Sequence, residues 1–292
     1  MYSFYFFKSP IFRSRIKKIT KKSVNQASFN ISNLKEIEIS LPSLDHQLHI
    51  ANLLSKAENL IAQRKESIRL LDEFLKSTFL EMFGEVSCNK KKFDKVGLKY
   101  FGEIITGNTP SRKNPDNYSS NYIEWIKTDN ITSDNTYVIK AVEYLSERGL
   151  KSARTANSGS LLVACIAGSI ESVGRAALTD RTVSFNQQIN AIQPKKEVEP
   201  LYLYWLFKIS KKYIQNHASK GMKKILTKGE FEKVKMIKPP LELQTKFAQI
   251  VEKTESLKAQ YKQSLQELEN LYGSMSQKAF RGELSVNKKV SV

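Results

Sequence analysis

A long segment of this chain occurs twice, and the repeat restricts the fold more than any other feature of the sequence. LPSLDHQLHIANLLSKAENLIAQRKESIRLLDEF begins at Leu41, and PPLELQTKFAQIVEKTESLKAQYKQSLQELENLY begins at Pro239. With Gln47 set opposite Gln244, an offset of 197 residues, identities recur without a gap. Upstream, YSFYFFKS near the N-terminus is echoed by LYLYWLFKIS at 201–210. About 85 residues are repeated, a period too long for a solenoid, so the chain contains a duplicated module.

Each copy of the repeat has the pattern of one long amphipathic helix. Apolar residues follow one another at alternating steps of about four and three, which is a heptad stripe. No proline interrupts either run, Asp45 is placed to cap the first helix, and Gly84 is placed to end it. The expected helix-pairing residues are Ile50, Leu54, Ile61, Ile68, Leu71 and Leu75 in the first copy, and Phe247, Val251, Leu257, Leu265 and Leu268 in the second.

Helices of this length cannot bury their apolar stripes alone. At ~1.5 Å per residue, some forty residues form a helix ~55–60 Å long. The segment between the two copies leaves from the end of the first helix and returns to the start of the second. We therefore expect the two helices to pack on each other as an antiparallel coiled coil.

The segment between the helices has a different pattern. Short runs such as YIEWI, TYVIKAVEYL, SLLVACIAG and NAIQP are rich in β-forming residues, and turn signals such as TGNTPS, KNPDN and SGS separate them. A helix is expected at 200–215, with Pro200 in its first turn. The expected fold class is α+β, with one mixed, mostly β domain flanked by two long helices.

The chain is strongly basic, and its positive charge is concentrated. It has 47 Lys and Arg residues against 29 Asp and Glu residues, a net charge of +18. The segment 208–238 contains ten lysines opposed only by Glu230 and Glu232, and a second basic cluster at 8–22 occupies the equivalent place in the repeat. A charge run is often only a solvated face, but its recurrence in a duplicated module favours a polyanionic partner such as nucleic acid.

Composition argues against several other classes. The two cysteines, Cys88 and Cys165, cannot build a disulfide framework, and with the three histidines they form no metal-ligand cluster, so no metal site is expected. No apolar run approaches the ~20 residues of a membrane span, and the N-terminal aromatic run precedes its basic residues, unlike a signal peptide. These features predict a cytoplasmic protein with no membrane partner.

Four motifs, taken in their order along the chain, resemble one known family. They are ITGNTPSRKNPDNY at 105–118, IEWIKTDNI at 123–131, LLVACIAGSIESVGRAAL followed by SFNQQINAIQP at 184–194, and PxLxxQ before each long helix. The chain resembles the specificity subunit of type I restriction-modification enzymes. In that family two target recognition domains each read half of a split DNA site, and two long helices hold them apart. The resemblance would explain the repeat as one spacer helix per recognition domain.

The resemblance implies a division of the chain into five segments. Residues 1–40 correspond to the tail of a first target recognition domain and 41–85 to a spacer helix. Residues 86–240 correspond to a complete target recognition domain, 241–282 to the second spacer helix and 283–292 to a tail. Only one complete reader of DNA is therefore expected.

The resemblance also implies partners and cofactors. The chain is expected to be non-catalytic, to bind double-stranded DNA and to dock methyltransferase (modification) subunits through its long helices, with a restriction and translocase subunit completing the enzyme. It is expected to bind no cofactor itself, since S-adenosylmethionine, ATP and Mg would belong to the partner subunits. A second reader would come from a homodimer formed through the helices or from a separate half-subunit. The remaining alternative is an inactive remnant.

Candidate DNA contacts are chosen by side-chain chemistry. Arg binds guanine bidentately and Asn binds adenine, whereas Lys suits phosphates. For each candidate, the alternative is that the side chain forms hydrogen bonds within a turn, packs in the core or is solvated. The amide side chains at 186–188 are expected to form hydrogen bonds with nearby backbone. The candidate DNA-binding residues are Arg112, Lys113, Asn114, Asn117, Tyr118, Arg154, Arg175, Lys220, Lys223 and Lys224.

Two other functional classes fit parts of the sequence. A stand-alone DNA methyltransferase is suggested by NPDNY at 114–118, which resembles the N-P-P-Y loop of amino-methyltransferases. The second proline is missing and no Gly-rich cofactor loop precedes the segment, so no catalytic residue is expected. A coiled-coil adaptor whose charge serves RNA or a membrane would contain the same helices. Binding competition between duplex DNA, RNA and anionic vesicles separates these classes.

Overall fold

The computed structural model describes residues 1–23, 26–133, 135–219 and 224–284. The chain divides into two compact units. Unit 1 consists of Met1–Asp72 and Glu255–Val292, and unit 2 consists of Glu73–Thr254. Each long helix contributes residues to both units, so the unit boundaries cut through the two predicted spacer helices.

The two copies of the repeat form α4 (Leu44–Phe83) and α9 (Leu241–Arg281), the long helices that the heptad pattern predicts. Gly84 follows α4 with a φ of +74°, a left-handed conformation that favours glycine and ends the helix. Asp45 lies within the first turn of α4 and not at its cap, and there its carboxylate complements the positive end of the helix dipole.

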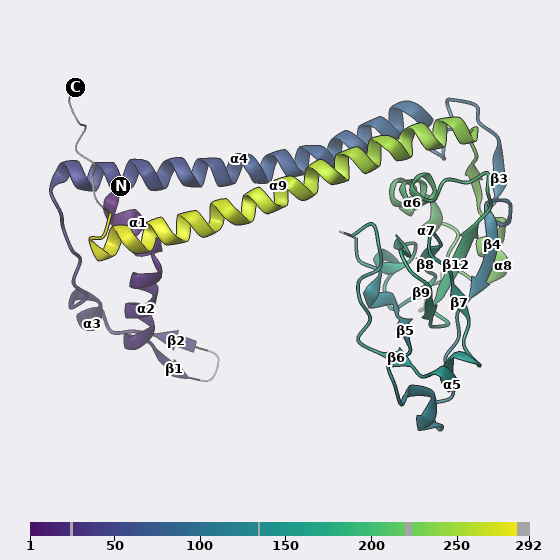
Figure 1. Cartoon of the computed structure of the whole chain (residues 1–292), viewed down its shortest axis with the longest axis horizontal. Coiled ribbons are helices and arrows are strands. Elements are labelled where there is room, and N and C mark those ends of the chain that lie inside the picture. Colours follow the sequence, from purple (N-terminus) through teal and green to yellow (C-terminus); the bar gives the residue numbers. More distant parts are fainter. Residues whose placement is uncertain (24–25, 134, 220–223, 285–292) are drawn as a thin grey trace. The chain divides into compact units, whose positions relative to one another are not determined.

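The two long helices run side by side in opposite directions (Figure 1). Within unit 1, Lys65 Nζ lies 2.8 Å from a carboxylate oxygen of Glu269, and Lys258 Nζ lies 2.5 Å from Asp72 Oδ1. Residue numbers rise from 65 to 72 along α4 while those of the partners fall from 269 to 258 along α9, so the pairing is antiparallel. The predicted α+β class with paired long helices is confirmed.

The apolar stripe is buried near the ends of the helices and half-buried between them. Ile50 and Leu54 are buried in unit 1, and Leu75, Phe247 and Val251 are buried in unit 2. The remaining stripe is half-buried because two helices alone leave the sides of their seam open to solvent. It consists of Ile61, Ile68, Leu71, Leu265 and Leu268.

The structure corrects one predicted helix-pairing residue. Leu257 is 37% exposed, whereas Thr254 and Lys258 are buried. The buried stripe passes from Val251 through Thr254 to Lys258 by steps of three and four, which leaves Leu257 at its edge. Lys258 can be buried because its ammonium group pairs with Asp72.

The repeated glutamine explains part of the repeated motif. Gln47 Nε2 donates a hydrogen bond of 2.8 Å to the carbonyl oxygen of Pro42, and Gln244 Nε2 donates one of 2.7 Å to that of Pro239. Both pairs keep the offset of the repeat. In each copy the glutamine of PxLxxQ therefore ties the first turn of the long helix to the extended segment before it.

Unit 1 consists of the first part of α4, the last part of α9 and several short elements (Figure 1). Its core is built from aromatic side chains of α1 and apolar residues of both long helices. The ring centres of Phe280 in α9 and Tyr2 in α1 lie 5.3 Å apart. The short elements are α1 (Tyr2–Lys8), α2 (Pro10–Ile19), β1 (Lys21–Ser23), β2 (Gln26–Ser28) and α3 (Ile31–Lys35). The buried core residues are Tyr2, Tyr5, Phe6, Ile50, Ala51, Leu54, Ala279 and Phe280.

Unit 2 contains the predicted mixed, mostly β domain. Its strands are β3 (Lys95–Gly97), β4 (Gly102–Thr106), β5 (Ile123–Ile126), β6 (Tyr144–Leu145), β7 (Thr155–Ala156), β8 (Leu161–Ala164), β9 (Ile166–Ala167), β10 (Ala176–Leu178), β11 (Val183–Phe185), β12 (Ile189–Pro194), β13 (Lys224–Ile225) and β14 (Lys235–Ile237). Its short helices are η1 (Leu98–Tyr100), η2 (Pro115–Tyr118), η3 (Thr128–Asn130), α5 (Glu147–Leu150), η4 (Ile170–Ser172), α6 (Pro200–Ile209), α7 (Lys211–Gln215) and α8 (Lys228–Lys233).

Two four-stranded sheets form the β domain. One is antiparallel with the order β10-β8-β12-β4, and the other has the order β6-β5-β11-β7, with β5 and β11 parallel. Strand β13 pairs with β9, and β14 pairs with β3. Helix α6 packs against β10 and β8. The ring centre of Phe83 in α4 lies 4.9 Å from that of Tyr202 in α6 and 5.6 Å from that of Phe247 in α9. The β domain and the adjoining parts of α4 and α9 therefore share one core.

Two expectations about local structure are corrected. The helix expected at 200–215 is broken at Ser210, whose backbone leaves the helical region, and so forms α6 and α7. The run TYVIKAVEYL contributes only β6 and an isolated bridge at Tyr137. Its backbone finds other partners, because the amide of Ile139 donates to Asn130 O and that of Ala141 to the Glu124 carboxylate. Among the described helices, none is long and apolar enough to cross a membrane.

Candidate nucleic-acid interface

The loop that carries half of the predicted contact residues starts from a fixed point on the β domain. The amide of Gly107 donates to Ile189 O and that of Asn108 to Phe185 O, each at 3.0 Å. A Cβ at Gly107 would lie 2.2 Å from the carbonyl oxygen of Asn186, so only glycine permits this approach. The loop therefore leaves β4 in a defined direction.

The fold brings Arg154 to the base of this loop. Asn108 Nδ2 donates to Ser152 O at 2.6 Å, and its Oδ1 accepts from the amide of Arg154 at 2.8 Å. The Arg154 guanidinium donates to Thr106 O at 2.7 Å and remains exposed. Two predicted contact segments that are distant in sequence are thus neighbours in space.

Three of the predicted contact residues hold the loop in shape. Asn114 caps η2 by accepting a backbone N–H two residues along the chain. The buried Asn117 donates to Ser111 O at 2.9 Å, and the hydroxyl of Tyr118 donates to Pro110 O at 2.7 Å. These side chains form hydrogen bonds within the loop, which agrees with the alternative expectation that polar residues here stabilise a turn. The exposed side chains of the loop have the better chemistry for external contacts.

Arg112 is exposed and is held by aromatic and acidic neighbours. Its Nη2 lies 2.6 Å from a carboxylate oxygen of Glu143, and its side chain is 57% exposed. Its guanidinium carbon lies 4.8 Å from the ring centre of Tyr118 and 5.3 Å from that of Trp125. A guanidinium stacked on aromatic rings keeps several N–H donors available for a base edge or a phosphate.

Glu143 connects Arg112 to a second cation, and no sequence pattern predicts this role for Glu143. Its carboxylate also forms an ion pair with Lys127, whose ammonium lies 5.2 Å from the ring centre of Trp125. The hydrogen bond from Lys127, together with the one from Arg112, lowers the pKa of the Glu143 carboxyl. Glu143 is therefore ionised at neutral pH and competes with any phosphate for both cations.

Other exposed polar groups surround the loop. Lys113 is exposed and forms no ion pair within the described part of the chain. Gln187 is exposed and accepts a hydrogen bond from the hydroxyl of Thr109. Its neighbour Asn186 is buried and bonds to Gln188, as the structural interpretation of this amide run expects. Gln187 belongs to the amide run that is expected to bond to nearby backbone, but its side chain is exposed and bonds to a hydroxyl, so it is an additional candidate contact.

Arg175 lies in a separate recess of unit 2, a cavity of about 190 Å³ that it lines together with Lys208 and Lys211. Its Nε is buried without a hydrogen-bond partner among the described residues. Burial and the neighbouring charge of Arg175 lower the pKa of Lys211. Closely spaced cations destabilise one another, so an anion in this recess would be bound favourably.

The predicted phosphate contacts of the basic segment are only partly described. Lys220 and Lys223 lie outside the described residues. Lys224 begins β13, and its backbone pairs with Ala167 of β9. This part of the prediction therefore rests on sequence.

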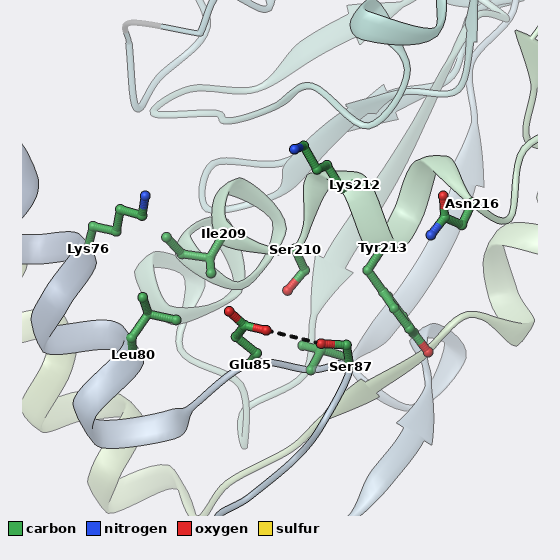
Figure 2. A pocket seen from close by; sticks show the side chains of 10 residues that line it. Lys76, Leu80, Glu85, Ser87, Ile209, Ser210, Lys212, Tyr213 and Asn216 are labelled. Carbon is green, nitrogen blue, oxygen red and sulfur yellow. Dashed lines mark hydrogen bonds between the residues drawn. The ribbon is translucent and has the colours of Figure 1, made fainter.

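A larger cavity of about 470 Å³ lies in unit 2 between the end of α4 and the pair α6–α7 (Figure 2). Glu85 and Ser87 on its wall are hydrogen-bonded at 3.2 Å, but both are exposed and only two residues apart, which is typical of a turn contact. The described residues contain no group of three or more His, Cys, Asp or Glu placed to hold a metal. Cys165 is buried, which raises the pKa of its thiol to about 12, so it behaves as a core residue.

The sequence matches the family model described as "Type I restriction modification DNA specificity domain" over residues 1–70 and 90–270. It is 26% identical over 250 residues to the protein assigned as the type I restriction enzyme MjaX specificity subunit of Methanocaldococcus jannaschii, covering 80% of this chain and 56% of the relative. It is 31% identical over 171 residues to the type I restriction enzyme HindI specificity subunit of Haemophilus influenzae, covering 56% of this chain and 36% of the relative. The chain spans about half the length of the first relative and about a third of the second.

Solved structures show a similar fold. The HsdS subunit from Thermoanaerobacter tengcongensis superposes with a TM-score of 0.56 at 17% identity, over 97% of this chain and 70% of that one. The type I restriction-modification S subunit from M. genitalium superposes with a TM-score of 0.58 at 17% identity, over 96% and 72% of the two chains.

Proposed function

Because the chain belongs to the family of type I restriction-modification DNA specificity domains, we propose that it is a non-catalytic subunit that binds duplex DNA sequence-specifically through unit 2. The observation that carries the proposal is the loop after β4. Its start is fixed to the sheet by Gly107, and it presents exposed Arg112 and Lys113 beside exposed Arg154. Fixed, exposed Arg side chains suit base recognition in the major groove.

The proposed contacts divide into two kinds. Arg112 is the candidate for a base edge, because its donors project from a stacked and fixed guanidinium. Lys113, Arg154 and the basic recess at Arg175 are candidates for phosphates, which position the protein without reading sequence. The lysines at 220, 223 and 224 belong to the same class by composition.

The lysine proposal has a direct test. Replacing Lys220, Lys223 and Lys224 with Ala should weaken specific and random duplexes alike and reduce the salt slope by about 0.9 per lost phosphate contact. Fluorescence anisotropy at several salt concentrations measures both quantities. A loss confined to the specific duplex would transfer these residues from phosphate contact to sequence recognition.

The long helices are proposed to dock methyltransferase subunits, with a restriction and translocase subunit joining the full enzyme. The apolar residues Leu60 and Leu70 support this proposal, because they are 51% and 49% exposed on the unit 1 part of α4. Exposed apolar surface on a helix is typical of a partner site. S-adenosylmethionine, ATP and Mg are proposed to bind the partner subunits.

The experiment that tests the proposed class is a binding competition with the isolated chain. A labelled duplex should be displaced by unlabelled duplex DNA and much less by RNA or anionic vesicles. Preference for RNA or vesicles would support the coiled-coil adaptor instead. Calorimetric titration with S-adenosylmethionine should give no binding, whereas submicromolar binding would indicate a stand-alone methyltransferase.

One recognition domain contacts only half of a split target, which offers few base contacts for the discrimination that a genome requires. Pairing of two copies would present two identical readers, and two-fold symmetry would then dictate an inverted repeat with a fixed gap. Sedimentation of the complex with the methyltransferase subunit gives the number of copies. A single-copy complex that methylates an asymmetric bipartite site would show that another polypeptide supplies the second reader.

A further inference from the structure

The recess beside Arg175 in unit 2 has the size of a site for one small anion. Its volume is about 190 Å³, below the ~300–1,000 Å³ of pockets that hold drug-sized ligands. A water molecule takes up ~30 Å³ of liquid, so the recess has room for one tetrahedral oxyanion and a few waters. The groups that line the recess decide which anion fits.

Arg175 brings hydrogen-bond donors without acceptors to the recess. Its Nη2 donates a long hydrogen bond of 3.5 Å to Thr128 O, and its Nε is buried without a partner among the described residues. A guanidinium is always charged and offers only donors. A buried donor of this kind is stabilised when an external acceptor reaches it.

The backbone on both sides of the recess is fixed. Gly174 has a φ of +78°, its amide donates to Ala164 O at 2.8 Å, and the amide of Ala164 donates to Arg175 O at 2.9 Å. On the other wall, Gln215 Nε2 donates to Val173 O at 3.1 Å, which ties α7 to the turn before β10. Side chains from the start of β10 and from α7 are therefore held beside each other without a ligand.

Lys211 is a second cation at the recess. It begins α7, and burial together with the charge of Arg175 lowers the pKa of its ammonium group. The exposed Glu171 acts on this pKa in the opposite direction. Neither Lys211 nor Arg175 forms an ion pair within the part of the chain that the structure describes. Two neighbouring cations without a paired carboxylate favour a bound anion.

Thr132 supplies a hydroxyl from a third element. It follows η3 and lines the recess. Its Oγ1 accepts a hydrogen bond of 2.8 Å from Asn135 Nδ2, which leaves the hydroxyl proton for another acceptor. Donors thus come from the start of β10, from α7 and from this loop. A phosphate has oxygens in several directions, whereas the two oxygens of a carboxylate lie in one plane, so phosphate suits these donors better.

We propose that the recess is a binding site for one phosphate group. Arg175 would donate to its oxygens, Lys211 would supply a point charge, and Thr132 would donate from the third side. Two sources present this chemistry. One is a free phosphate ion, and the other is a phosphodiester of duplex DNA.

The register of the sheet places the recess within reach of a duplex on the loop after β4. Thr106 lies opposite Asn190, and Ala176 lies opposite Val163. Asn190 also lies opposite Val163, so the four residues form one row across β4, β12, β8 and β10. The loop after β4 and Arg175 therefore leave the same end of the sheet, three strand spacings or ~14 Å apart, which compares with the ~12 Å width of the major groove. The DNA source rests on the proposed function, whereas the free-phosphate source does not.

Competitive labelling of lysines by acetic anhydride, measured by mass spectrometry, tests the site in the whole chain. The reagent attacks the neutral amine, so a bound anion, which raises the pKa of Lys211, slows its reaction. Lys212 is the matched control, because it is the next residue, is exposed and lines the larger cavity instead. Sodium phosphate is compared with sodium chloride at equal ionic strength.

Phosphate should slow labelling of Lys211 about tenfold, because an opposite charge within ~4–6 Å shifts a pKa by about one unit, and should leave Lys212 unchanged. Arg175→Gln should remove this protection. Arg148→Gln should keep it, since the Arg148 side chain is 65% exposed and pairs with Asp116. The melting temperature gives a second measurement: phosphate should raise it in the parent chain and in Arg148→Gln, but not in Lys211→Gln.

A duplex with unphosphorylated ends separates the two sources. Fluorescence anisotropy shows whether the duplex binds, and labelling shows whether it protects Lys211. A bound duplex that protects Lys211 assigns a backbone phosphate to the recess. A bound duplex that leaves Lys211 reactive, while free phosphate protects it, assigns free phosphate and leaves DNA recognition intact.

The site and the proposed DNA recognition can fail separately. Protection by phosphate in a chain that binds no duplex would contradict DNA recognition and leave the phosphate site standing. Labelling of Lys211 that neither phosphate nor duplex slows would overturn the phosphate site, and so would protection that persists in Arg175→Gln.

Discussion

Removing the negative charge of Glu143 should strengthen DNA binding. The carboxylate of Glu143 pairs with Arg112 and with Lys127, two of the cations beside the loop after β4. Glu143→Gln keeps the size of the side chain and removes its charge. Both cations are then released for phosphates or base edges, so this loss of an ion pair should increase affinity.

The magnitude follows from the exposure of the pair. The side chains of Arg112 and Glu143 are 57% and 35% exposed, so solvent screens their attraction. Such a pair is worth about 0–1 kcal/mol. Its release should therefore tighten duplex binding by up to about fivefold, and each cation that gains a phosphate should steepen the salt slope by about 0.9.

The assay is fluorescence anisotropy with a duplex that contains the target half-site, titrated at several salt concentrations. Glu147→Gln is the matched control, because Glu147 is exposed and forms no ion pair within the described residues, so the same charge is removed without releasing a cation. Glu143→Gln should bind more tightly than this control. Weaker binding by Glu143→Gln than by Glu147→Gln would refute the assignment of the loop to the DNA-binding surface.

Two further predictions concern recognition and assembly. Arg112→Ala should reduce the discrimination between target and mutated half-site by about 1–3 kcal/mol, measured by competition binding; a uniform loss with discrimination intact would assign Arg112 to the backbone. Leu71→Glu or Leu268→Glu should place a charge in the half-buried seam of α4 and α9 and abolish co-purification of the methyltransferase subunit. An unchanged complex with both variants would contradict docking through the helix pair.

The long helices could be predicted from sequence because their signal is local and repeated. The heptad stripe, the absence of proline and the position of Gly84 all indicate the same helix, and the structure contains it. The failure at Leu257 has a tertiary cause. The spacing of Leu257 fits the apolar stripe, but the buried seam passes through Thr254 and Lys258 because Lys258 forms an ion pair with Asp72 on α4. A local sequence pattern does not indicate a partner on another helix.

The candidate site could be predicted only by residue type. Arg112 and Lys113 are exposed, but Asn117 and Tyr118, chosen from the same loop, use their polar groups to hold it. Sequence cannot separate these roles, because both require polar side chains near a turn. Glu143 is brought to the loop by the pairing of β5 with β6, so its importance appears only in three dimensions.

The most direct test of the central claim is methylome sequencing of cells that carry this gene together with the gene for the proposed methyltransferase partner. A sequence-specific DNA recognition subunit predicts methylation at one defined motif, absent when the gene is deleted and changed or relaxed at one base position by Arg112→Ala. Methylation that persists at the same motif without this gene, or that follows no sequence motif at all, would contradict the claim that this chain reads DNA sequence.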